Sequence, residues 1–197
     1  IPNVEILDNL YKIIYLRGEN PDKVKLLLGN HDYAYICYGT QMSGFNFTMM
    51  HDYRYAFESN WNKFDLSWGY ENKERIYTLF SHAGLTEYFY SQLVAEYYNP
   101  KSNLNFLKDN NYSLSDFINF FKDKKDILWQ IGLARKGISK TGSILWADKK
   151  ELLSDPFKGI NQVVGHSPLL KHEKYRVNNN SIENYYLSLP VNKNNYK

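Results

Sequence analysis

Three of the five histidines in this chain of 197 residues occupy the same local setting. His31 lies in the segment LLLGNHD, His82 in LFSHAGL and His166 in VVGHSPL, so each follows a short apolar run and lies close to a glycine. In α/β proteins, ligand sites lie on loops beyond the carboxyl ends of the strands. The repeated setting therefore predicts three strand-to-loop junctions whose imidazoles converge on one point.

The order of the periodic segments predicts an α/β fold. Apolar residues at helical spacing predict helices over residues 3–17, 48–64 and 86–98. Short apolar runs predict strands over residues 24–28, 75–80 and 161–164. Ser113, with Asp116 three residues later, predicts the N-cap of a further helix. We therefore expect one α/β domain over residues 1–177, followed by an Asn-rich tail over residues 178–197.

The composition excludes several classes of protein. Lys and Arg (24) exceed Asp and Glu (21) by only three charges, and no basic stripe runs along the chain, so we expect no nucleic-acid partner. No apolar run approaches the roughly 18 residues of a membrane span, so we expect a soluble protein without a membrane partner. The low cysteine content fits a reducing compartment, so we expect the protein to be cytoplasmic. The single cysteine, Cys37, excludes an internal disulfide and is predicted to be a small buried residue. The composition does not determine the oligomeric state.

The three histidines suit a metal site. Neutral imidazole is a good ligand for divalent transition metals, and the Asn and Asp oxygens beside His31 suit a mixed nitrogen and oxygen site. A single histidine near a strand end is more often a capped or half-buried structural residue. Three histidines in the same setting favour the metal site over that structural interpretation.

Several segments resemble blocks of the calcineurin-like metallophosphoesterases. Gly29-Asn30-His31-Asp32 resembles their GNH[D/E] block, Ser81-His82-Ala83-Gly84 the block of their isolated metal-binding histidine, and Gly165-His166-Ser167-Pro168 their late G-H-[S/T] block. Ile144-Leu145-Trp146-Ala147-Asp148 resembles the LW[S/A]D segment of the serine/threonine phosphoprotein-phosphatase branch. Ser43-Gly44-Phe45, followed by a helix, is similar to small bacterial and phage members of that branch. The order and spacing of the three histidine blocks match those of the family.

The resemblance implies a calcineurin-like β-sandwich flanked by helices, and a hydrolase with two divalent ions of Mn, Fe or Zn. Asn30, His82 and His166 would be ligands of one ion, and His31 the acid that protonates the leaving group. Asp32 would either orient His31 or cap the turn that follows. The implied reaction is hydrolysis of a phosphate monoester, as in protein phosphatases, by a hydroxide shared between the ions. The implied partner is a phosphorylated substrate such as a phosphoprotein.

Arg135, in the segment GLARKG, is the candidate phosphate clamp. A guanidinium matches phosphate oxygens with two parallel hydrogen bonds, which is why arginine recurs at phosphate sites. The alternative interpretation of Arg135 is a solvated surface residue.

Two blocks of the family pattern do not occur in the chain. The family begins with D-x-H and then G-D-x-x-D, which supply the ligands of the other ion, and neither block precedes Asn30. We therefore expect a first βαβ unit of about 40–60 residues to precede Ile1 in the natural protein. Residues 1–197 alone would then bind one ion weakly and hydrolyse little.

Two other functions remain open. The G-H-S-P block also resembles symmetrical dinucleoside-tetraphosphate hydrolases, whose late histidine is followed by Thr-Pro. A non-catalytic binding module on a degenerate phosphoesterase fold is the alternative of a different class, and the two absent blocks favour it. The retained Asn30, His31, His82 and His166 oppose it, because an inactive scaffold has no physical need for half a shell of ligands.

Overall fold

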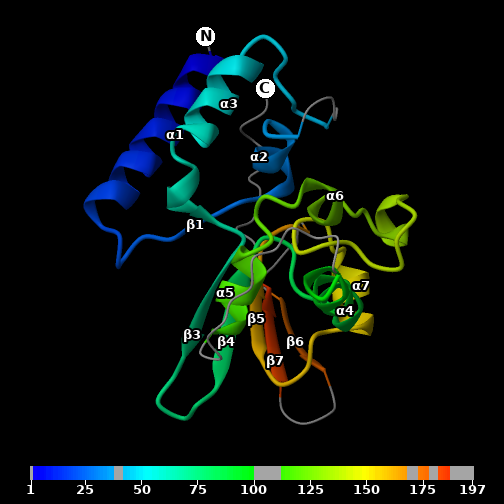
Figure 1. Ribbon diagram of the computed structural model, residues 1–197. Helices are drawn as coiled ribbons and strands as arrows, with labels where there is room; N and C mark the ends of the chain where they lie inside the picture. The colour runs from blue at the N-terminus through cyan, green and yellow to red at the C-terminus, as the bar shows by residue number, and fades with distance from the viewer. Residues whose placement is uncertain (1, 38–41, 100–111, 168–172, 178–181, 187–197) are drawn as a thin grey trace. The chain divides into compact units, whose positions relative to one another are not determined.

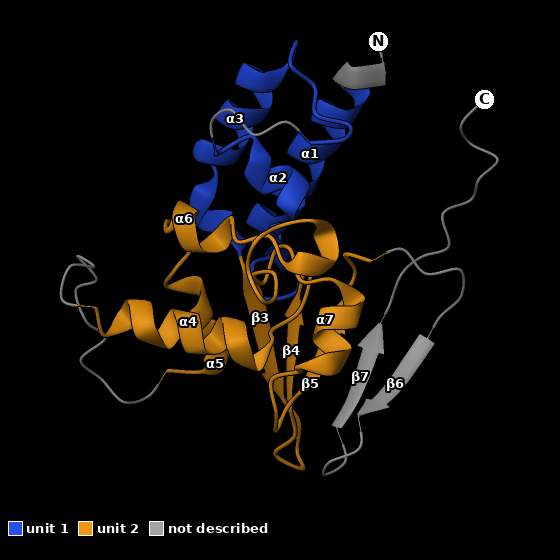
Figure 2. Cartoon of the chain, turned by 90° about the vertical axis from the view of Figure 1, so that its right-hand side faces the viewer, with its two compact units in different colours: residues 1–65 blue, residues 66–197 orange. Residues whose placement is uncertain are grey.

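The computed structural model of the chain describes residues 2–37, 42–99, 112–167, 173–177 and 182–186 (Figure 1). The chain divides into two compact units, residues 1–65 and residues 66–197 (Figure 2). Pro168 of the G-H-S-P block and residues 178–181 and 187–197 of the predicted tail lie outside the described residues.

The first unit begins with a long helix, α1 (Pro2–Glu19), which confirms the helix predicted over residues 3–17. Its apolar side chains recur at helical spacing, and Ile14 is buried. The helix ends where Asn20 donates a side-chain hydrogen bond of 3.2 Å to the Leu16 carbonyl and Pro21 stops the helical hydrogen bonding. α1 packs against α3 (Met50–Glu58) and the 3-10 helix η1 (Trp61–Lys63).

A two-stranded parallel sheet completes the first unit. Strand β1 (Leu26–Leu27) lies within the predicted strand 24–28 and pairs with β2 (Phe64–Asp65). The helix predicted over residues 48–64 is too long at its C-terminal end, because α3 ends at Glu58 and Phe64 pairs with Leu26 in the sheet. Aromatic residues at helical spacing continue past Glu58, so the apolar pattern alone did not indicate the end of the helix. The short helix α2 (Asn30–Ala34) follows β1.

The second unit is built on a mixed five-stranded sheet in the order β3-β4-β5-β7-β6, which Figure 1 shows. Its strands are β3 (Ser67–Glu71), β4 (Tyr77–Ser81), β5 (Asn161–Val164), β6 (Glu173–Val177) and β7 (Ile182–Tyr186). β4 and β5 confirm the predicted strands, whereas β3, β6 and β7 were not predicted. The domain boundary predicted at residue 178 falls between β6 and β7, which pair in this sheet.

Strand directions determine which loops lie at the same edge of the sheet. β3 and β4 are antiparallel, and β4 runs parallel to β5, with Phe80 opposite Val163. The carboxyl ends of β4 and β5 therefore lie side by side at one edge of the sheet. The segments with His82 and His166 leave the sheet at this edge.

The helices of the second unit, apart from the 3-10 helix, contribute buried side chains to its core together with strand and loop residues. They are α4 (Glu87–Tyr97), α5 (Leu114–Asn119), α6 (Lys125–Leu128), the 3-10 helix η2 (Leu133–Arg135) and α7 (Lys149–Ser154). Ser113 and Asp116 form the predicted capping box at the start of α5. α5 packs against β3 (Figure 1), where the Asn119 side chain accepts the N–H groups of Leu66 and Ser67 and donates to the Ser67 carbonyl.

The mixed arrangement of helices and sheets confirms the predicted α/β class. Cys37 is buried, as predicted. Within the described residues, no helix combines the length and the apolar character that crossing a membrane requires.

Candidate functional site

The backbone ties together the two loops that follow β4 and β5. The Gly165 N–H and the His166 N–H both donate to the carbonyl of His82, at 3.0 and 2.9 Å. Since both donors come from the loop after β5, this loop is bound to the loop after β4 at the position of the histidine. The parallel strands and these two hydrogen bonds hold the backbone of His82 next to the backbone of His166.

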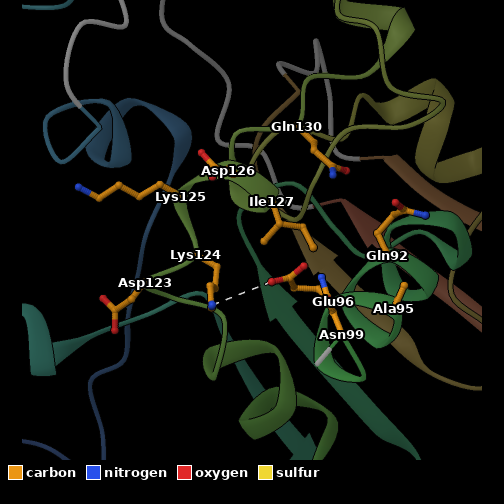
Figure 3. Close-up of a pocket in the computed structure, with 10 residues that line it drawn as sticks. All are labelled: Gln92, Ala95, Glu96, Asn99, Asp123, Lys124, Lys125, Asp126, Ile127 and Gln130. Atoms are coloured by element: carbon orange, nitrogen blue, oxygen red, sulfur yellow. Dashed lines mark ion pairs between the residues drawn. The ribbon is translucent and has the colours of Figure 1, made fainter. Parts of the chain in front are cut away.

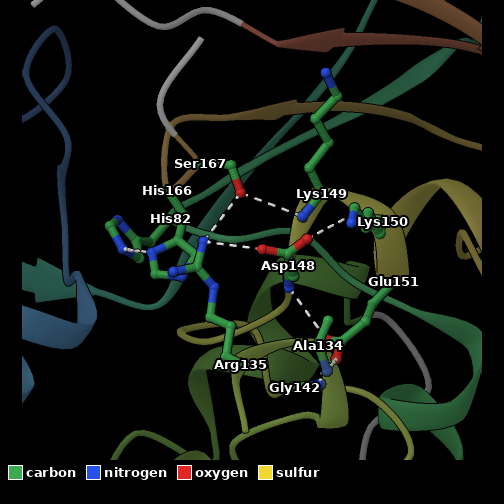
Figure 4. Close-up of polar contacts among 10 residues, drawn as sticks. All are labelled: His82, Ala134, Arg135, Gly142, Asp148, Lys149, Lys150, Glu151, His166 and Ser167. Carbon is green, nitrogen blue, oxygen red and sulfur yellow. Dashed lines mark hydrogen bonds and ion pairs between the residues drawn. The ribbon is translucent and has the colours of Figure 1, made fainter.

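The imidazoles of His82 and His166 meet directly. His166 Nδ1 lies 2.8 Å from His82 Nε2, and the ring planes are inclined by 62° (Figure 4). At this contact one nitrogen donates its proton and the other accepts it. The structure thus brings together two of the three predicted metal ligands, both half-buried.

Gly84 permits the tight turn after His82. Its backbone has φ +97°, a conformation that favours glycine, and a Cβ at this position would lie 2.5 Å from Leu152 Cδ2. The Gly84 N–H donates to Ser81 Oγ at 3.1 Å, and the Ala83 N–H donates to the Ile144 carbonyl at 2.9 Å. The loop after β4 is therefore held against the segment that resembles LW[S/A]D.

The imidazole pair fits a divalent metal as a partial ligand set. Metal–nitrogen distances of about 2.0–2.1 Å place two imidazole nitrogens on one ion roughly 3.0–3.4 Å apart, and the pair is separated by 2.8 Å. A small increase in the distance between the two nitrogens would therefore let an ion take the place of the hydrogen bond. In the part of the chain that the structure describes, no group of three or more His, Cys, Asp or Glu side chains is placed to hold a metal ion.

Arg135 contacts Ser167, the residue that follows His166, and so lies next to the loop that carries one imidazole of the pair. Its Nη2 atom donates to Ser167 Oγ at 3.2 Å and forms an ion pair of 3.2 Å with Asp148 Oδ2 (Figure 4). Arg135 Nε is buried and has no hydrogen-bond partner among the described residues. Its guanidinium is thus anchored at one nitrogen and retains an unmet donor at another, which differs from a freely solvated arginine.

Asp148 and Ser167 connect Arg135 to helix α7. Asp148 is the N-cap of α7, where its Oδ1 atom accepts the Lys150 N–H at 3.0 Å. Ser167 Oγ accepts the Lys149 N–H at 3.2 Å in addition to the donor from Arg135. These contacts place the phosphate-clamp candidate, the first turn of α7 and the loop of His166 in one hydrogen-bonded group.

Sequence reasoning did not identify Asp148, Glu151 and Ser167 as site residues. Glu151 is 7% exposed, and its carboxylate accepts backbone N–H groups of Ala134 and of Asp148. The spacing D-x-x-E of Asp148 and Glu151 is a capping-box pattern, and this signal was present in the sequence. Ser167 lies within the G-H-S-P block itself.

The GNHD block forms the start of helix α2 in the first unit. Asn30 is buried, His31 is exposed, and Asp32 Oδ2 accepts the Gly29 N–H at 2.8 Å. Asp32 therefore caps the start of α2, whereas the sequence predicted either a cap of the turn that follows Asp32 or an orienting contact with His31. Burial raises the pKa of the Asp32 carboxyl, and the Gly29 hydrogen bond and the neighbouring His31 oppose this only in part.

The predicted site residues are divided between the two units. Asn30, His31 and Asp32 belong to the unit of residues 1–65, whereas His82, Arg135 and His166 belong to the unit of residues 66–197. Asn30, His31 and Asp32 are consecutive residues of α2, whereas His82 and His166 are in contact and Arg135 is bonded to Ser167, the residue after His166.

A pocket of about 910 Å³ lies elsewhere in the second unit, between α4 and α6 (Figure 3). Charged and amide side chains line it, including Gln92, Glu96, Lys124, Asp126 and Gln130, and Lys124 Nζ lies 4.0 Å from Glu96 Oε1. None of the predicted site residues is among its lining residues.

No protein-family model, curated protein or solved structure matches this chain. The contact between His82 and His166 and the contacts of Arg135 with Ser167 and Asp148 have chemical consequences.

Proposed function

We propose that this chain belongs to a metal-dependent phosphoesterase that hydrolyses phosphate monoesters, as protein phosphatases do. One observation carries the proposal: His166 Nδ1 and His82 Nε2 lie 2.8 Å apart at the carboxyl ends of two parallel strands. This is the edge of an α/β sheet at which ligand sites are found. The proposal includes a calcineurin-like sandwich, to which the mixed sheet of the second unit would contribute.

His82 and His166 would hold one ion of Mn, Fe or Zn, with Asn30 as a further ligand. Imidazole nitrogens and an amide oxygen suit such ions. A second ion would need ligands other than these three residues. Divalent ions held there would supply Lewis-acid polarisation and would make a water molecule more acidic.

Arg135 would bind the substrate phosphate. Its guanidinium charge suits a phosphate oxygen, and the contacts with Ser167 and Asp148 reduce the number of side-chain conformations available to it. A guanidinium that is already ordered loses less conformational entropy when the phosphate binds.

His31 would protonate the leaving alkoxide. An exposed imidazole is accessible to a substrate oxygen, and a ring N–H can donate a proton to it. In this role Asp32 acts on the backbone by capping α2, since its carboxylate is bonded to the Gly29 N–H.

The test is hydrolysis by the natural protein supplied with Mn²⁺, using a phosphopeptide and a dinucleoside tetraphosphate as competing substrate classes. Release of inorganic phosphate from the phosphopeptide supports the proposal. Cleavage of the dinucleoside tetraphosphate alone would assign the site to the other hydrolase class. No hydrolysis of either substrate, with no metal bound by elemental analysis, would contradict the proposal and indicate a non-catalytic binding module.

A further inference from the structure

The buried carboxylate of Glu151, in the second unit, accepts hydrogen bonds from three separate backbone N–H groups. Glu151 accepts the N–H of Ala134 at 2.9 Å through Oε1, and the N–H groups of Gly142 and Asp148 at 2.8 and 3.1 Å through Oε2 (Figure 4). A buried charge is costly unless it is hydrogen-bonded, and hydrogen bonds to a charged acceptor are stronger than neutral ones. Glu151 therefore binds these amides more firmly than a neutral side chain would.

Two of the three amides bracket the segment that carries Arg135. Ala134 directly precedes Arg135, and Gly142 ends the basic stretch that follows it. Gly132 allows the carboxylate to approach, because a Cβ at this position would collide with Glu151 Oε1. One carboxylate thus holds both ends of residues 134–142.

The third amide belongs to the ion-pair partner of Arg135. Glu151 Oε2 accepts the Asp148 N–H, while Asp148 Oδ2 lies 3.2 Å from Arg135 Nη2. Glu151 therefore holds the backbone beside Arg135 and the backbone of Asp148 at the same time. The relative position of these two side chains depends on one buried group.

We propose that Glu151 is a positioning residue that holds the Arg135 guanidinium in the position needed for phosphate binding. The inference rests on the proposed function, in which Arg135 contacts the substrate phosphate. Glu151 does not touch the substrate in this account and acts through the backbone of residues 134–142 and through Asp148. A misplacement of about 1 Å at a binding group can cost up to roughly 100-fold in rate, so the effect is measurable.

The test is a double-substitution cycle in the natural, Mn²⁺-supplied protein with p-nitrophenyl phosphate as substrate. We expect Glu151→Gln to raise KM roughly tenfold in the wild-type background and to have no further effect in the Arg135→Ala background. Amide hydrogen exchange at Ala134 and Gly142 should become faster in Glu151→Gln. If this variant does not fold, Glu151→Asp withdraws the carboxylate from the three amides while keeping its charge, and the same results are expected.

Asn119→Ala is the matched control, because the Asn119 side chain also makes three backbone hydrogen bonds, all of them to Leu66 and Ser67 and so outside residues 134–142. It should lower stability and leave KM unchanged. An unchanged KM in Glu151→Gln, an equal loss in both backgrounds, or unchanged amide exchange would overturn the role of Glu151. Absence of hydrolysis by the wild-type protein would instead contradict the proposed function.

Discussion

His166 Nδ1 lies 2.8 Å from His82 Nε2, although 84 positions separate the two residues in the sequence. The contact arises because β4 and β5 are parallel neighbours and because the His82 carbonyl accepts the N–H groups of Gly165 and His166. Two imidazole nitrogens that face each other at this distance are close to the spacing of two ligands on one divalent ion. This relationship connects the sheet topology to the proposed metal chemistry.

The turn after His82 should tolerate no side chain at Gly84. Gly84→Ala combines a positive φ with a contact of 2.5 Å to Leu152 Cδ2, and overpacking of this kind costs roughly 1–3 kcal/mol. Gly159→Ala is the control, because Gly159 has a similar φ of +81° but no atom within 4 Å of the added Cβ. Urea unfolding should show a larger loss for Gly84→Ala. Equal losses in the two variants would contradict the close packing.

Asp148 should contribute to stability as the N-cap of α7. Asp148→Ala removes the acceptor for the Lys150 N–H and should lower the free energy of unfolding by about 1 kcal/mol. Asp148→Asn keeps a side-chain oxygen and should retain most of that stability, although both variants lose the charge that faces Arg135. Denaturant unfolding compares the two variants. If Asp148→Asn and Asp148→Ala lower the free energy of unfolding equally, the side-chain cap of α7 contributes little to stability.

The Asp32 carboxyl should make stability depend on pH. Because burial raises its pKa above the ordinary value of 3.8, the folded protein binds this proton more tightly than the unfolded chain does. Stability from this group is therefore present at low pH and is lost as the pH rises through the folded pKa.

Asp32→Asn removes this dependence and keeps an oxygen for the Gly29 N–H. In metal-free buffer, its stability relative to the wild type should increase between about pH 3 and about pH 7. Urea unfolding at the two pH values measures the change. If the difference in unfolding free energy between Asp32→Asn and the wild type is the same at both pH values, or falls at the higher pH, the raised pKa of Asp32 is contradicted.

Local patterns in the sequence predicted the elements on which the site is built. The apolar runs before His82 and His166 correspond to β4 and β5, and Ser113 with Asp116 correctly predicted the start of α5. These signals depend on neighbouring residues, so they are readable without the fold. The convergence of three histidines was also predicted, and the structure shows the contact of two, His82 and His166.

Contacts between distant positions were not predictable in the same way. Phe64 fits helical spacing after Phe57, but its backbone pairs with Leu26, which overrides the local preference. The bonds from the Glu151 carboxylate to Ala134 and Gly142 depend on how the chain folds back after η2. Such contacts depend on burial and on the hydrogen bonds that a buried charge requires. The local residue pattern indicates neither the burial nor the bonding partners.

Metal binding by the imidazole pair is the most direct test of the proposed function. Electron paramagnetic resonance measures free Mn²⁺ during a titration of the chain, of His82→Ala and His166→Ala, and of His51→Ala as a control at an exposed position on α3. We expect the wild type and His51→Ala to bind Mn²⁺ with equal affinity, and each of the other two variants to lose at least roughly tenfold. Mn²⁺ affinity that is unchanged in both His82→Ala and His166→Ala would contradict the proposed metal site.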